Sequence, residues 1–201
     1  MILLYGVAAG LAAGLARALI TRRPYAVPEL RWPGLLLVAF LPQLVAFNLP
    51  VTRASFPDQL APFALVSSQV LLLVWVLANI KKPVFWLLAL GLILNLVVIL
   101  ANGGLMPIQP EMVMHLYPDA PPDAWSVGER LGVGKDIVLP ARQTRLWFLS
   151  DRFTLPDWSP YQFAFSLGDV LLAVGAVWIL WRAGAGPDDE REGNRHGTKV
   201  E

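Results

Sequence analysis

Long, uninterrupted apolar runs constrain this chain more than any other feature of its sequence. We identify five of them, at residues 2–20, 33–47, 60–80, 83–101 and 163–181. Each is close to the ~20 residues that cross a hydrocarbon layer of about 30 Å, and the second run is the shortest. Backbone polar groups find no water inside lipid, so each run is predicted to be a helix. The sequence therefore predicts an all-α integral membrane protein with about five transmembrane helices.

The composition agrees with this class and excludes several others. Hydrophobic residues make up 56% of the chain and charged residues only 15%, whereas an ordinary soluble domain carries roughly 25% charged residues. The formal net charge of +1 offers no basic surface for nucleic acid, so no nucleic-acid partner is expected. The chain has no cysteine and two histidines, which excludes thiolate chemistry and argues against a His-rich metal or haem site. We expect no cofactor.

The basic residues predict how the helices are oriented. Arg22, Arg23 and Arg31 follow the first run, and Lys81-Lys82 separates the third run from the fourth. Cytoplasmic loops are enriched in Lys and Arg, so the N-terminus is predicted outside and the C-terminus in the cytoplasm. Residues 1–182 then form one membrane domain, followed by a polar cytoplasmic tail, residues 183–201, whose composition predicts disorder.

One long loop, residues 103–160, lies on the predicted outer side. It is interrupted by prolines, which disfavour long regular elements. Two short pieces have a helical pattern, residues 111–117 and residues 141–153. The second piece combines large apolar residues with arginines, as in a segment that lies at a membrane surface.

The first run contains a glycine at every fourth position. Gly6, Gly10 and Gly14 form a flat stripe on which another helix can pack closely. Two interpretations follow. The stripe packs against another helix of this chain, which is the simpler interpretation because five helices offer several neighbours, or it associates with a second copy or another membrane protein. The remaining expected partner is the lipid bilayer itself.

Several polar residues fit structural roles. Asn95, inside the fourth run, is expected to form a hydrogen bond to a neighbouring helix. Asn102 and Gly103 have the chemistry of a helix C-terminus, since glycine tolerates the left-handed conformation that closes the last turn.

The long loop contains one pattern that could bind a metal, and we assign no metal to it. Glu111, His115 and Asp119 recur at four-residue spacing and would share one helical face. Pro118, however, interrupts the helix before Asp119.

Asp169 is the one acid within the last apolar run, and it has two interpretations. The order Ser166-Leu167-Gly168-Asp169 fits a capping box, in which the serine hydroxyl and the acid satisfy backbone N–H groups at a helix start. A helix N-terminus also favours negative charge. The alternative is catalytic: Asp151 is a second acid on the same side, and two acids that share a proton can activate water and protonate a leaving amine. Whether Asp169 faces Asp151 decides between these interpretations.

The segment Asp151-Arg152 followed by Asp169 locally resembles lipoprotein signal peptidases, which place one acid in Asn-x-x-Asp-Arg and the other in Asn-x-Ala-Asp at the start of the last helix. Here both motif asparagines are missing and Gly168 replaces the alanine. A wider resemblance, carried by ANGGLMP, TRLWFLSD and FSLGDVLLAVG, is to an uncharacterised family of bacterial multi-spanning membrane proteins, a domain of unknown function. Relatives are expected to have Lys-His at Lys135-Asp136. This resemblance implies residence in a bacterial inner membrane and implies no activity.

We therefore predict a multi-pass membrane protein that serves as an accessory, assembly or scaffold component. The alternative is an aspartyl-type membrane hydrolase that uses Asp151 and Asp169. A small transporter, which would need a polar cavity near Asn95, is the third hypothesis.

Overall fold

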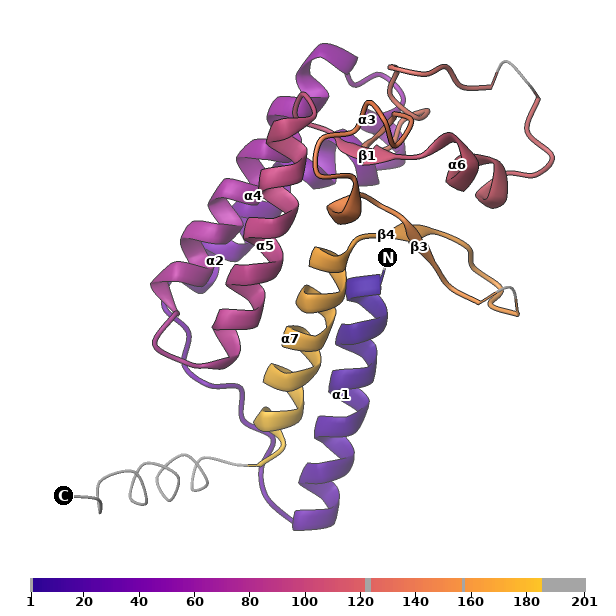
Figure 1. The fold of residues 1–201 in the computed structure, drawn as a ribbon. Coiled ribbons are helices and arrows are strands. Elements are labelled where there is room, and N and C mark those ends of the chain that lie inside the picture. Colours follow the sequence, from indigo (N-terminus) through magenta and orange to yellow (C-terminus); the bar gives the residue numbers. More distant parts are fainter. Residues whose placement is uncertain (1, 122–123, 157, 186–201) are drawn as a thin grey trace.

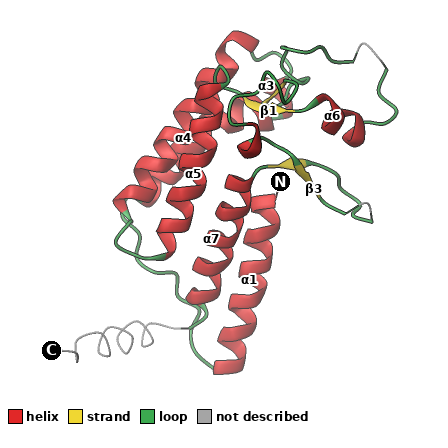
Figure 2. Cartoon of the chain, in the orientation of Figure 1, coloured by secondary structure: helices red, strands yellow, loops and turns green. Residues whose placement is uncertain are grey.

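The structure is a computed structural model of the chain, and it describes residues 2–121, 124–156 and 158–185. The described part is mostly helical (Figures 1 and 2). Most of the tail predicted to be disordered, residues 186–201, lies outside the described residues. The elements, in chain order, are α1 (Ile2–Thr21), α2 (Pro33–Gln43) with a π-helical turn (Leu44–Asn48), α3 (Pro50–Arg53), a 3₁₀ turn (Asp58–Leu60), α4 (Ala61–Ala78), α5 (Val84–Ala101), β1 (Met106–Ile108), α6 (Pro110–Leu116), β2 (Asp136–Val138), a second 3₁₀ turn (Trp147–Leu149), β3 (Phe153–Thr154), β4 (Ala164–Phe165) and α7 (Leu167–Ala183).

Three helical segments are long and apolar enough to cross a membrane: Ile2–Thr21, Asp58–Ala78 and Val84–Ala101. The run predicted at residues 33–47 forms a shorter apolar helix, Pro33–Asn48. Pro42 lies inside it and cannot donate a backbone hydrogen bond, and the π-helical turn follows directly. The last run gives α7, which is 17 residues long. These apolar helices are compatible with a membrane protein, and five spans with an outer N-terminus remain a prediction.

The main helix–helix packing follows the order α2, α4, α5, α7, α1, so that α1 and α2 are the two ends of the series. The last helix of the described residues, α7, thus lies between α1 and α5 (Figure 1). The glycine stripe of α1 is buried against α7. A Cβ built on Gly6 would lie 2.8 Å from the carbonyl oxygen of Ala173, and one on Gly10 would lie 2.8 Å from Cα of Val177. The stripe therefore serves packing within this chain.

The long loop folds over the ends of α5 and α7 (Figure 2). It contributes two small sheets, in which β1 pairs with β2 in parallel and β3 pairs with β4 antiparallel. The helix predicted near residues 111–117 is present as α6. The prediction of a helix at residues 141–153 is wrong, because this segment contains only the 3₁₀ turn Trp147–Leu149 and the start of β3. Leu146, in the middle of the segment, has a left-handed backbone with φ of 55°, which a helix does not allow.

Asn102 fixes that segment to the end of α5. Its side-chain nitrogen donates to the carbonyl of Arg145, and the backbone N–H of Arg145 donates to its side-chain oxygen at 2.9 Å. Gly103 and Gly104 follow with φ of 85° and 91°. This left-handed pair turns the chain from α5 into β1, where Gly104 N–H still reaches the carbonyl of Ile99. Asn102 therefore ends one element and positions another.

Candidate polar centre

The capping box expected from the sequence is present at the start of α7. Ser166 is the N-cap, and its hydroxyl oxygen accepts a hydrogen bond from the backbone N–H of Asp169 at 3.0 Å. In return, one carboxylate oxygen of Asp169 accepts from the backbone N–H of Ser166 at 3.3 Å. These bonds satisfy two of the backbone donors that a helix start leaves open. Asp169 thus has a structural role in α7.

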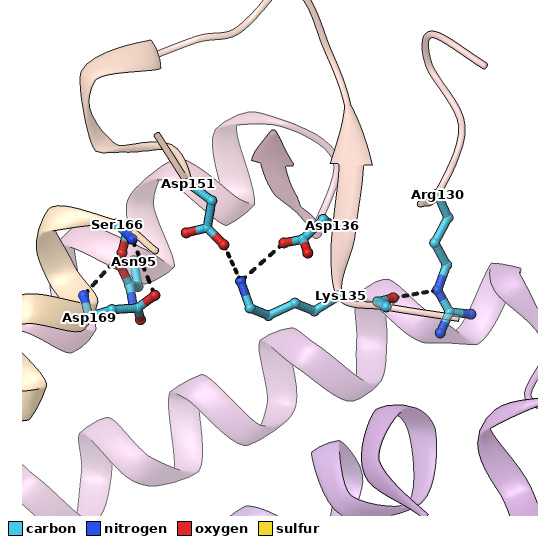
Figure 3. A network of polar contacts seen from close by, with 8 residues as sticks. Asn95, Arg130, Lys135, Asp136, Asp151, Ser166 and Asp169 are labelled. Atoms are coloured by element: carbon cyan, nitrogen blue, oxygen red, sulfur yellow. Dashed lines mark hydrogen bonds and ion pairs between the residues drawn. The ribbon is translucent and has the colours of Figure 1, made fainter. Parts of the chain in front are cut away.

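Asn95 of α5 connects this helix start to the rest of the bundle. Its side-chain nitrogen donates to the other carboxylate oxygen of Asp169, and its oxygen accepts from the hydroxyl of Ser166, both at 2.8 Å. Asn95 is 2% exposed, and a buried amide needs such partners. Asn95, Ser166 and Asp169 form a closed set of hydrogen bonds, which we call the Asn95 cluster (Figure 3).

The second acid, Asp151, lies next to this cluster. Its backbone forms an isolated parallel β-bridge with Ile108, and its backbone N–H donates to the carbonyl of Pro107. The side chain is buried, and one of its oxygens contacts the ammonium of Lys135 at 2.5 Å. Lys135 also contacts Asp136 at 3.0 Å. In Figure 3, Asp151 lies between Lys135 and the Asn95 cluster.

The electrostatics of this centre are unbalanced, because three carboxylates (Asp136, Asp151 and Asp169) act on one ammonium. Burial raises the pKa of Asp151 to about 8, and the charges of Asp136 and Asp169 act in the same direction, while Lys135 opposes them. Burial lowers the pKa of Lys135, but the three carboxylates outweigh it and hold that pKa well above its ordinary value. The centre therefore keeps Lys135 charged and binds a proton near neutral pH.

The oxygen Oδ1 of Asp151 carries a further signal. It is buried and accepts no hydrogen bond from the described residues. A buried carboxylate oxygen without a partner is costly, since its hydration is lost and nothing replaces it. A proton on this carboxyl reduces that cost, in agreement with the raised pKa.

The structure brings Asp151 and Asp169 into one centre, and it leaves the proposed metal residues apart. Helix α6 ends at Leu116 and Tyr117 is its C-cap, so Asp119 lies beyond the helix that carries Glu111 and His115. Within the described ranges no group of three His, Cys, Asp or Glu side chains could hold a metal ion. Arg152 stacks on Trp147, with 4.5 Å from its guanidinium carbon to the ring centroid.

Sequence reasoning missed Lys135 and Asp136 as members of the centre. A Lys-Asp pair in a polar loop is typical of a solvated turn, and no spacing relates it to Asp151. The available signal was the pair of β-branched apolar residues that follows directly, Ile137 and Val138, which belongs to a strand. Because Val138 is buried, the strand that contains it also places the preceding residues, Lys135 and Asp136, close to the protein interior.

Comparisons with known proteins add a family and no activity. No curated protein and no solved structure matches the chain. A family model described as a family of unknown function (DUF5317) matches residues 28–181. This match includes α2, α4, α5, the long loop and α7 up to residue 181, and hence every residue of the polar centre. Because the match covers more than half of the sequence, the chain belongs to this family of unknown function.

Proposed function

We propose that the protein is a non-enzymatic accessory or assembly component of a bacterial inner membrane, which binds another membrane protein laterally through α1. The observation that carries this proposal is the position of α1 at one end of the helix series. It packs on α7 through its glycines, and the alanines on its other sides are exposed: Ala8, Ala9, Ala12, Ala13 and Ala16. Small residues let a second helix approach closely, and van der Waals packing then favours association in lipid.

The polar centre supports this role because its groups bind mainly to one another. The Asn95 cluster uses both ends of the Asn95 amide and both oxygens of Asp169. Lys135 is held between Asp136 and Asp151. Such contacts fix the long loop and α7 on α5 and so give the protein a defined surface on the predicted outer side.

Photo-crosslinking tests the proposal. A photoreactive amino acid at Ala12 should give a protein adduct of discrete mass in native membranes. Val97, on an exposed side of α5 (44% exposed), is the matched control and should give none. Two differently tagged copies distinguish a second copy of this chain from another protein. If Ala12 gives no protein adduct, or if Val97 gives the same one, lateral association through α1 is wrong.

A second function, aspartyl-type hydrolysis, is favoured by one specific observation. Asp151 and Asp169 belong to the same centre, and Asp151 has a raised pKa and an oxygen that accepts no hydrogen bond from the described residues. A protonated Asp151 would donate to a leaving group, while Asp169 would orient water. Lys135 occupies the other oxygen of Asp151, and this contact would have to loosen for a substrate.

The two functions differ in how they respond to Asp151→Asn. An amide keeps the shape of the side chain and cannot serve as a proton donor and acceptor pair with Asp169. A hydrolase would lose all activity in cells at normal protein abundance. An assembly component would keep the α1 crosslink and its cellular role, with a change in stability alone.

A further inference from the structure

A pocket of about 390 Å³ opens at the end of the bundle opposite the polar centre. Arg31, Trp32, Val74 and Ala78 line it. Its volume falls in the range of small-ligand sites. Two lining residues come from the last turns of α4 and two from the segment that leads into α2. The pocket therefore joins a charged and aromatic edge to the apolar side of a helix that is long and apolar enough to span a membrane.

Asn79 connects the two segments that line this pocket. Its side-chain oxygen accepts from the backbone N–H of Arg31 at 2.8 Å, and its nitrogen donates to the carbonyl of Arg31 at 3.1 Å. The same nitrogen donates to the carbonyl of Trp75. Asn79 is buried, with 4% exposure. Because the backbone N–H and C=O of Arg31 are both hydrogen-bonded to Asn79, the backbone of Arg31 is fixed at the end of α4.

Trp32 is placed by backbone strain. Its φ is 52°, in the left-handed region that side chains other than glycine rarely adopt. Pro33 follows and begins α2, and a residue before proline is disfavoured in the right-handed helical region. Trp32 is 64% exposed and lines the pocket. Tryptophan is enriched at the boundary between lipid tails and head groups.

The charges at this end favour an anion. The residues in the connections there include Arg22, Arg23, Lys81 and Lys82 besides Arg31, and Glu29 is the one acid among residues 22–32 and 79–83. Arg31 forms no ion pair with another residue in the described part of the chain. A guanidinium beside an apolar wall suits a phosphate group that is attached to acyl chains.

We propose that this pocket binds the head group of an anionic phospholipid. Arg31 binds the phosphate, Trp32 packs beside the glycerol region, and Val74 and Ala78 contact the start of the acyl chains. The orientation predicted from the basic loops places this site in the cytoplasmic leaflet, where anionic lipids attract basic segments. The site is independent of the polar centre and of α1.

Native mass spectrometry of the full chain in detergent tests the site, with phosphatidylglycerol and phosphatidylcholine as probes. The wild-type protein should bind one phosphatidylglycerol more tightly than phosphatidylcholine. Arg31→Gln should weaken that binding about tenfold or more, the loss expected for one charge-assisted hydrogen bond. Arg53→Gln, an exposed arginine at the other end of the bundle, is the matched control and should bind as the wild type does.

A second variant tests the pocket without changing charge. Ala78→Phe should fill the space and weaken phosphatidylglycerol binding to a similar extent, whereas Leu77→Phe, on the same helix and outside the pocket, should not. The proposal is overturned if Arg31→Gln and Ala78→Phe both bind as tightly as wild type, or if phosphatidylcholine binds equally well. Excess inorganic phosphate should leave lipid binding intact; full displacement by phosphate would assign the site to free phosphate instead.

Discussion

Gly168→Ala is the most informative single change in this structure. Gly168 lies in the first turn of α7, at the point where α7 crosses α5. A methyl group there would lie 2.6 Å from the side-chain carbon of Asn95 and 2.7 Å from the carbonyl oxygen of Gly91, and closer still to the side-chain oxygen of Asn95. Real Cβ atoms do not approach other atoms this closely. Asn95 can turn away, but the Gly91 carbonyl is backbone and cannot.

The cost follows from what must move. Overpacking of a close contact costs about 1–3 kcal/mol. If the Asn95 amide turns away, Ser166 and Asp169 each lose a buried partner, and an unsatisfied buried group costs about 1–3 kcal/mol. Some of these costs are alternatives, since relief of the clash is what breaks the bonds. We therefore expect the free energy of unfolding to fall by about 2–5 kcal/mol.

Reversible unfolding in mixed detergent micelles, followed by tryptophan fluorescence, measures this change. The chain has 8 tryptophans, so the signal reports on several helices. Gly34→Ala is the matched control, because nothing lies within 4 Å of a Cβ at that position of α2. Alanine is the better helix former by about 1 kcal/mol, so the control should be neutral or slightly more stable.

A double-mutant cycle locates the source of the loss. Asn95→Ala removes the amide that a methyl on Gly168 would strike, so Gly168→Ala should cost at least about 1 kcal/mol less in that background than in the wild type. The contact with Gly91 remains in both. If Gly168→Ala lies within about 0.5 kcal/mol of wild type, or costs the same in the Asn95→Ala background, the tight α5–α7 crossing described here is incorrect.

Three further predictions concern the polar centre and α1. The pKa of Asp151 is about 8 in the folded protein, above the ordinary 3.8, so at intermediate pH the folded protein holds a proton that the unfolded chain releases. The free energy of unfolding of the wild type, relative to that of Asp151→Asn, should therefore fall as the pH rises from about 4 to about 8, by up to about 1.4 kcal/mol per pH unit. Unfolding titrations at each pH measure this difference. A flat difference would refute the raised pKa. Ser166→Ala should lower the free energy of unfolding by about 0.5–2 kcal/mol, measured the same way, and Ser55→Ala, at an exposed serine, should not. Gly10→Ala should cost about 1–3 kcal/mol because a Cβ there meets the backbone of Val177, whereas Ala12→Leu, on the exposed side of α1, should leave monomer stability unchanged.

Local patterns predicted the parts of this fold that local interactions determine. The helices follow from the length of the apolar runs, and the capping box at Ser166 and Asp169 needs only residues within one turn. The glycine stripe of α1 predicted a close contact, and the sequence left its partner open. That partner is α7, more than 160 residues away along the chain, a pairing that no local pattern encodes.

The long loop was predicted less well, because its structure depends on contacts with the helices. Residues 141–153 have helix-forming composition, but Asn102 holds the backbone of Arg145 and Leu146 turns left-handed. The sequence predicts that Lys135 is a surface residue. In the structure, the pairing of β2 with β1 places its ammonium between Asp136 and Asp151. In both cases a tertiary hydrogen bond or ion pair overrides a local preference.

Gly168 is one position at which this chain differs from the peptidase motif, and the structure gives Gly168 a packing role of its own. That motif has alanine where this chain has Gly168, and an asparagine of its own near the acid. Here the amide that binds Asp169 comes from Asn95 of another helix, and its side-chain oxygen occupies the space that an alanine methyl would need. The glycine and the distant asparagine are therefore complementary: either change alone leaves a clash or an unsatisfied acid. Gly168→Ala should therefore cost less when Asn95 is also replaced, although the contact with the Gly91 carbonyl remains, and the cycle of Gly168→Ala and Asn95→Ala measures this coupling.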